Sequence, residues 1–216
     1  KISGHIVNVG AGDGCIEAYN RECDEANEFL ELADPMVPMS DVRSRTRAID
    51  TKFKGHLYEP NEKNVAILSA TYKNISIGGG VDASNFARIL QSDGVPHNID
   101  FLKYDTDAQD CDSVLAVIDA GFQPLLVLAE FNLLFPPPIG FNLPYTKGLY
   151  TWAKRTPYAV QLGNECSLSF LSKQMGVRGY VLLQVDWWDA LFVTSQVYQT
   201  AFSLFPIYDD LTWWLY

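Results

Sequence analysis

The chain has 216 residues and a formal net charge of −10, and 48% of its residues are hydrophobic against 19% charged. This length suffices for one domain with a sizeable core, and the composition is that of a folded protein, not a disordered one. The acidic charge argues against a protein that binds nucleic-acid phosphates, and the basic run "RSRTR" is more typical of a solvated loop. No apolar run approaches the roughly 20 residues of a membrane span.

Short apolar runs alternate with helix-like segments along the first two thirds of the chain, a pattern typical of a parallel sheet flanked by helices. In chain order we predict strands at 5–10, 55–60, 74–80, 99–105 and 124–132, and helices at 14–20, 61–72, 82–94 and 110–121. Asn61 and Asp82 are the expected N-caps, and Gly94 and Gly121 the expected helix ends. Residues 20–54 interrupt the alternation and are predicted to be an irregular excursion.

In the last third of the chain the regular alternation of strands and helices ends. The run "PLLVLAEFN" is almost entirely apolar, which is typical of a central strand covered on both faces. Residues 132–158 contain three consecutive prolines and are predicted to be an irregular connection. A helix at 165–176 then precedes two strands, at 179–185 and 189–195, whose short link "DWWD" predicts an antiparallel hairpin.

The four cysteines show no C-x-x-C pair and no histidine at ligand spacing, so a structural zinc site is not expected. We expect reduced thiols, which favours a reducing compartment; the compartment itself is left open, because a removed targeting peptide would leave no trace. The cysteines are Cys15, Cys23, Cys111 and Cys166.

A glycine-rich turn follows the first predicted strand. Gly10, Gly12 and Gly14 give G-x-G-x-G, with Cys15 where the dinucleotide pattern G-x-G-x-x-G has its third glycine. A strand, glycine turn and helix in this order present backbone N–H groups to a ligand above the turn. The shorter spacing suits the amino-acid end of S-adenosylmethionine, although such turns also occur without a ligand.

Acidic residues follow two other strands. Glu59, in "LYEP", ends the second strand, where a carboxylate can accept hydrogen bonds from both ribose hydroxyls. Asp105 ends the fourth strand at the carboxyl edge of the sheet, where ligands of open α/β folds bind, and Asp107 follows it. Asp110 and Asp112 are acids at a helix N-terminus and are expected to be structural. A divalent-ion site at Asp105, Asp107 and Asp110 is the less favoured alternative, and we predict no metal.

Five motifs in this order resemble the FkbM-like branch of class I S-adenosylmethionine-dependent methyltransferases, and more narrowly its algal and protist members. They are "VNVGAGDG", "LYEPN", "IDFLKYDTDAQDCDSVLAVIDAGFQP", "LAEFNLLFPPP" and "GNECSLSFLSKQMGVRGYVLLQVDWWDALFV". The resemblance implies a Rossmann-like α/β fold over 1–204, with a mainly parallel seven-stranded sheet in the order 3-2-1-4-5-7-6 and a C-terminal antiparallel hairpin. It also implies S-adenosylmethionine as cofactor.

The same resemblance implies roles for individual residues. Gly10, Gly12 and Gly14 border the methionine end of the cofactor, Glu59 its ribose, and Asp105 the edge of the methyl-transfer site. Asn8 stands where the family usually has an acid that holds the cofactor's ammonium group, and the amide brings no charge. Tyr104 stands where the family prefers an aliphatic residue.

If the chain is an enzyme, we expect O-methyl transfer to a small-molecule, sugar or lipid acceptor, with a carboxylate as base. The candidate catalytic residues are Asp105, Asp107 and Glu130, although Glu130 could equally be a structural acid that binds the proline-containing connection. The alternative is a catalytically silent subunit of a larger assembly, possibly an organellar membrane-associated one. Its protein partner would dock on the aromatic tail at 205–216, unless this tail folds back on its own sheet.

Overall fold

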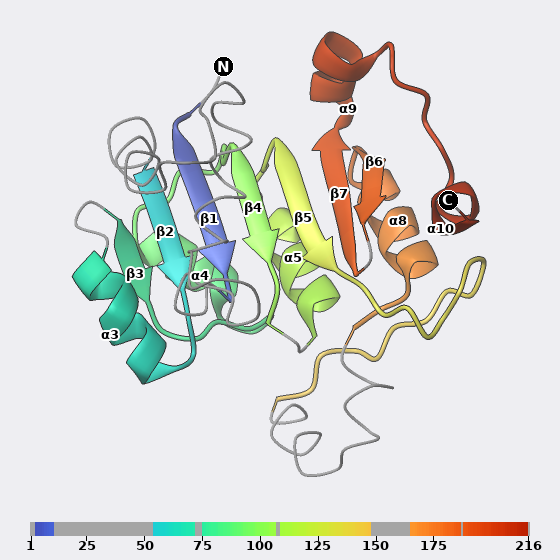
Figure 1. Cartoon of the computed structure of the whole chain (residues 1–216). Helices are drawn as coiled ribbons and strands as arrows, with labels where there is room; N and C mark the ends of the chain where they lie inside the picture. Colours follow the sequence, from blue (N-terminus) through green and yellow to red (C-terminus); the bar gives the residue numbers. More distant parts are fainter. Residues whose placement is uncertain are drawn as a thin grey trace, which may run out of the picture. The chain divides into compact units, whose positions relative to one another are not determined.

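The computed structural model describes residues 3–10, 54–71, 75–106, 109–147, 165–186 and 188–215, which belong to two compact units, Lys1–Val81 and Asp82–Tyr216 (Figure 1). The predicted helix at 14–20 and almost all of the predicted excursion at 20–54 lie outside the described residues.

The first unit contains a three-stranded parallel sheet. β2 (Lys54–Tyr58) pairs with β1 (His5–Val9) on one side and with β3 (Ser76–Gly78) on the other, as predicted. Residues 6–9 of β1 and 55–58 of β2 are buried, as expected for strands covered on both faces. The three predicted strands of this unit are therefore confirmed.

The helix α3 (Glu62–Thr71) connects β2 to β3 and begins where the sequence predicts. Asn61 is its cap, because the Oδ1 of Asn61 accepts a hydrogen bond from the Lys63 N–H at 3.0 Å. Leu68 of this helix packs with Leu57 of β2 in a core cluster to which Ile75 and Ile77 add partly buried side chains.

The second unit contains a four-stranded mixed sheet in the order β4-β5-β7-β6. β4 (Phe101–Tyr104) and β5 (Leu126–Glu130) are parallel, whereas β7 (Asp189–Thr194) runs antiparallel to both β5 and β6 (Tyr180–Asp186). The predicted α/β class, with mainly parallel strands and a C-terminal antiparallel hairpin, is thus confirmed. Within each unit the strand order equals the corresponding part of 3-2-1-4-5-7-6.

Three helices of this unit pack in succession, each against the next. α4 (Phe86–Ser92) contacts α5 (Asp110–Asp119), α5 contacts β5 and α8 (Leu168–Val177), and α8 contacts β6. The apolar side chains of these helices and strands are completely buried and form the core of the unit: Phe86, Leu90, Leu102, Val114, Val117, Val127, Leu168, Leu171 and Val193.

The helix boundaries agree with the sequence at the C-terminal ends and differ at one N-terminal end. Gly94 and Gly121 follow α4 and α5 with φ angles of 70° and 94°, a left-handed conformation that glycine adopts without strain. Asp82, however, does not cap α4. Its carboxylate accepts hydrogen bonds from the N–H and hydroxyl of Ser84, at 2.8 and 2.6 Å, so a turn precedes the helix, which begins at Phe86.

The C-terminal segment folds back on its own unit, one of the two alternatives that the sequence left open. After α9 (Ser195–Val197) and η1 (Tyr198–Phe202), α10 (Asp210–Leu215) packs against α8 and β6. Asp210 accepts a hydrogen bond from the Ser169 hydroxyl, and the ring of Trp214 lies 6.3 Å from that of Phe131. None of the described helices combines the length and the apolar character that crossing a bilayer requires.

Two cysteines form a disulfide. Cys111, in the first turn of α5, is bonded to Cys166, two residues before α8, and both residues are buried. The expectation of four reduced thiols is therefore wrong for this pair, and the argument that it gave for a reducing compartment fails. The pairing escaped the sequence analysis because the two cysteines are 55 residues apart, with no motif to link them.

Candidate functional site

The glycine turn and the acid after the second strand lie at the ends of neighbouring strands of the first unit. Val9 at the end of β1 is opposite Tyr58 at the end of β2, and the Gly10 N–H donates to the Tyr58 carbonyl at 2.9 Å. Gly10 has a φ of 77°, which favours glycine at this turn. The predicted adjacency of the turn and Glu59 is thereby present in the fold.

Glu59 is buried at the carboxyl edge of this sheet. Its N–H donates to the Gly78 carbonyl at 3.2 Å, so the ends of β2 and β3 are joined beside it. One carboxylate oxygen accepts from the Asn61 N–H at 2.8 Å. A carboxylate offers about four acceptor positions, so it can also accept from ligand hydroxyls. Asn8 is buried within β1, whereas Gly12 and Gly14 lie outside the described residues.

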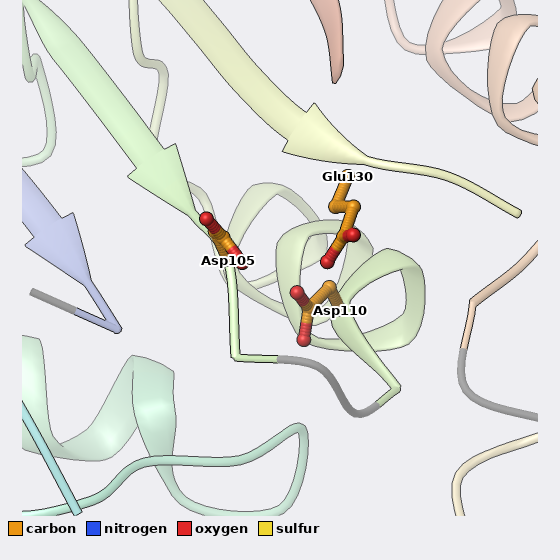
Figure 2. Close-up of side chains that lie close together, drawn as sticks. All are labelled: Asp105, Asp110 and Glu130. Carbon is orange, nitrogen blue, oxygen red and sulfur yellow. The ribbon is translucent and has the colours of Figure 1, made fainter. Parts of the chain in front are cut away.

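Three carboxylates of the second unit point toward one another (Figure 2). Asp105 follows β4, Asp110 begins α5 and Glu130 ends β5, and one oxygen from each lies within 4.8 Å of the others. The predicted site residues Asp105 and Glu130 are thus brought together, while Asp107 lies outside the described residues. Asp110, which the sequence analysis expected to be structural, joins them. We call Asp105, Asp110 and Glu130 the acid cluster.

Asp110 is completely buried and held by its neighbours. Its carboxylate accepts from the N–H of Thr106 at 2.7 Å and also from the hydroxyl of Thr106. The Asp110 N–H in turn donates to the Oε2 of Glu165 at 3.1 Å. These bonds fix the beginning of α5 between the loop after β4 and the segment before α8.

Glu165 is a fourth acid beside the cluster, and sequence reasoning missed it. Burial raises the pKa of Glu165 well above its usual range, and the negative charges of Asp110 and Glu130 add to the rise. Glu165 stands in the quoted motif "GNECS", but a lone glutamate in an irregular segment carries no spacing signal of its own. The disulfide of its neighbour Cys166 holds it near α5.

Asp105 is a partly exposed acid of the cluster. Its side chain is 37% exposed, and the buried Lys103 places its ammonium nitrogen 3.7 Å from an oxygen of Asp105. Lys103 therefore supplies a positive charge at the same strand end.

The connection after β5 passes over the beginning of α5. The Gln109 side chain donates to the carbonyls of Leu143 and Pro144, at 3.1 and 3.0 Å, and accepts from the Thr146 N–H at 2.9 Å. Asp112 accepts from the side-chain amide of Asn142 at 3.0 Å and from the N–H of Tyr145. Asp112 thus has the structural role that the sequence predicts. As predicted, the described residues 131–147 form no helix or strand.

Tyr104, where the resembled family prefers an aliphatic residue, is a core residue here. Its ring packs edge-on against Phe86 at 5.3 Å, and its hydroxyl forms a hydrogen bond with Ser113. Burial raises the pKa of Tyr104 far above its usual range, with Asp110 adding to the rise, so this phenol stays neutral and does not act as a base.

No protein-family model matches the sequence, and no curated protein does. Solved structures to which the chain shows a likeness include an O-methyltransferase family protein from Burkholderia thailandensis, at 11% identity and a TM-score of 0.46, covering 88% of this chain and 50% of that one. Another is the O-methyltransferase TomG from Streptomyces achromogenes in complex with S-adenosylmethionine, at 11% identity and a TM-score of 0.45. The match covers 88% of this chain and 73% of TomG. A third is human N-acetylserotonin methyltransferase, also in complex with S-adenosylmethionine, at 9% identity and a TM-score of 0.41. The match covers 88% of this chain and 47% of the human enzyme. The chain spans about half the length of two of these proteins.

Proposed function

We propose that this protein is an S-adenosylmethionine-dependent methyltransferase of the FkbM-like type, which transfers a methyl group to a hydroxyl of a small-molecule, sugar or lipid acceptor. One observation carries the proposal: the glycine turn after β1 and Glu59 after β2 end two hydrogen-bonded parallel strands. Ligands of open α/β sheets bind outside the carboxyl ends of such strands.

The residues at these strand ends fit the cofactor. Gly10 at the turn has no side chain that would obstruct a ligand's amino-acid end, and the buried Glu59 can accept from two adjacent ribose hydroxyls. Asn8 is an amide on the same strand and can accept a hydrogen bond from an ammonium group without adding charge. We expect this to cost about 1–2 kcal/mol in affinity relative to an acid, which is roughly tenfold or more.

The acids of the second unit are suited to proton removal from an acceptor. S-adenosylmethionine supplies the methyl group in an in-line displacement, so the protein contributes positioning and a base for the hydroxyl proton. Asp105 and Glu130 are the candidate bases, because they are the two acids at the ends of β4 and β5. Asp107 remains a candidate from the sequence alone.

The proposal is tested by calorimetric titration of the full chain with S-adenosylmethionine. We expect binding at micromolar concentration and a loss of about 10- to 100-fold in Glu59→Gln, because hydrogen bonds to a charged group contribute about 1.5–3 kcal/mol. Glu62→Gln is the matched control: it removes the same charge from an exposed position at the start of α3 and should bind as the wild type does.

Two results would refute this assignment. One is the absence of heat with the wild-type chain at millimolar cofactor, and the other is equal affinity in Glu59→Gln and the wild type. Because Glu59 also accepts from the Asn61 N–H, a thermal melt of the variant is needed to show that α3 still forms.

The alternative of a silent subunit is suggested by departures from the family pattern, such as Asn8 and Tyr104, and by the aromatic tail. In the structure α10 packs on α8 and β6, and Trp214 lies near Phe131. Trp213 and Trp214 therefore lie in a helix that packs on its own unit, and this alternative is not favoured, although Phe205 and Tyr208 are exposed. The same calorimetry separates the two functions, since a silent subunit need not bind S-adenosylmethionine.

A further inference from the structure

The acid cluster gathers more carboxylates than a base for one proton requires. We propose that Asp105, Asp110 and Glu130, together with Glu165, form a binding site for a divalent cation of about the size of Ca²⁺. The three cluster residues come from the end of β4, the start of α5 and the end of β5, and their side chains converge on one point (Figure 2).

The spacing of the oxygens suits such an ion. Three atoms that lie within 4.8 Å of one another share a point no farther than about 2.8 Å from each, which is 4.8 Å divided by the square root of three. Ca²⁺ binds oxygen at about 2.3–2.6 Å, so a small contraction suffices, whereas Mg²⁺ at about 2.0–2.1 Å demands a larger one. Carboxylate oxygens are also the ligands that these hard cations prefer.

The buried carboxylate of Glu165 gives independent support for a bound cation. Its Oε2 accepts from the Asp110 N–H at 3.1 Å, which anchors the side chain against the cluster. Its Oε1 is buried and has no hydrogen-bond partner among the described residues, and the residue as a whole is 5% exposed. Buried polar atoms without a partner are costly and therefore rare, and a cation bound at the cluster would give this oxygen one.

Neighbouring residues fix the orientation of the carboxylates, and the site is accessible to ions from solvent. Thr106 donates through its N–H and its hydroxyl to Asp110, as residues behind a metal ligand commonly do to fix its orientation. The disulfide between Cys111 and Cys166 ties the segment that carries Glu165 to the first turn of α5. The partly exposed side chain of Asp105 places the site at the surface of the unit, within reach of solvent ions.

Cation binding has a consequence for the candidate bases. A carboxylate that coordinates a cation is a weaker base, so Asp105 and Glu130 would serve as ligands when the ion is bound. The inference does not rest on the proposed methyl transfer, because it is tested without cofactor or acceptor.

The experiment is calorimetric titration of the full chain, first freed of metal by chelation, with Ca²⁺ and separately with Mn²⁺. We expect one site per chain, with a dissociation constant of about 10⁻⁵ M or tighter, within the range of carboxylate-rich Ca²⁺ sites. Glu130→Gln and Glu165→Gln should each weaken binding at least tenfold. Asp186→Asn is the control, because it removes an exposed carboxylate of the same unit, in the β6–β7 hairpin.

A thermal melt with and without 1 mM Ca²⁺ keeps the inference falsifiable if a variant folds poorly. The wild type and Asp186→Asn should be stabilised by the ion, and Glu130→Gln should not. Without the ion, Glu130→Gln should be at least as stable as the wild type, because it removes one of several like charges from a partly buried cluster. The inference is overturned if the wild type shows no saturable binding, or if Asp186→Asn loses as much affinity as the cluster variants.

Discussion

The disulfide between Cys111 and Cys166 should contribute strongly to the free energy of unfolding. The loss expected on its removal follows from the length of the loop that it closes. The two residues are 55 positions apart. In the chain-entropy relation, closing a loop of this length removes about 14 cal/mol/K from the unfolded chain, which is about 4 kcal/mol at 25 °C. Measured losses for native disulfides are commonly about 2–5 kcal/mol, so we expect the double variant Cys111→Ala, Cys166→Ala to lose an amount in that range.

The assay is urea unfolding of the wild type under oxidising and reducing conditions and of the double variant. Reduced wild type and double variant should have similar free energies of unfolding, both below that of the oxidised wild type by the same few kcal/mol. Comparing the oxidised and reduced wild type leaves every side chain in place, so it isolates the bond from any cavity that alanine leaves. Peptide mapping without reductant should recover Cys111 and Cys166 as one linked species.

Two outcomes would refute this reasoning. The folded, oxidised protein could release four titratable thiols on unfolding, in which case the bond does not form. Alternatively, the bond could be present while the oxidised and reduced proteins unfold at the same urea concentration. The entropy argument would then fail, because the reduced chain would be held together equally well without the tether.

Three further predictions concern single positions, each measured by the free energy of unfolding. Gly10→Ala should cost about 1–2 kcal/mol because φ is 77°, whereas Gly79→Ala, where an added Cβ meets nothing within 4 Å, should cost less than about 0.5 kcal/mol; equal losses would contradict the argument from φ. Ser167→Ala should cost about 1–3 kcal/mol, because its hydroxyl caps α8 and accepts from a second backbone N–H. Arg178 lowers the pKa of Asp119 by hydrogen bonding, so the pair stabilises the fold above the ordinary pKa of about 3.9 and loses this contribution as the pH falls through the lowered folded value. Since the Asp119 side chain is 58% exposed, its pair with Arg178 should contribute less than about 1 kcal/mol at pH 7. The cost of Arg178→Ala should be smaller at low pH, where only the hydrogen bonds of Arg178 to Gln174 remain.

The strands and most helix ends were predictable from local chemistry. Short, mainly apolar runs, several of them bounded by proline or glycine, predicted all seven described strands, because such runs leave few alternatives to a buried strand. Glycines with positive φ ended α4 and α5 where expected. The start of α4 was wrong, since an aspartate that can cap a helix can equally close a turn with a serine two residues later, and local sequence does not decide between them.

The candidate site was only partly predictable, because its residues meet through long-range contacts. Asp105 and Glu130 were found as acids at the ends of strands, which is a topological signal. Glu165 carries no such signal and reaches Asp110 across 55 residues of sequence. The disulfide that keeps Glu165 near α5 joins Cys111 and Cys166, which no sequence motif links. Asp110 was assigned to helix-dipole compensation, and only the position of β5 shows that it also faces Glu130.

The first turn of α5 explains why these long-range contacts occur together. The N-cap Gln109 and the first three residues of α5 anchor three segments: Gln109 and Asp112 hold the connection after β5, Asp110 holds Thr106 and Glu165, and Cys111 holds the segment before α8. Because successive residues of a helix point in directions about 100° apart, one turn can bind segments on several sides. A rigid anchor of this kind keeps several carboxylates together against their mutual repulsion, which a loop could not do. The effect on the acid cluster of loosening this turn should therefore exceed the effect of any single lost hydrogen bond.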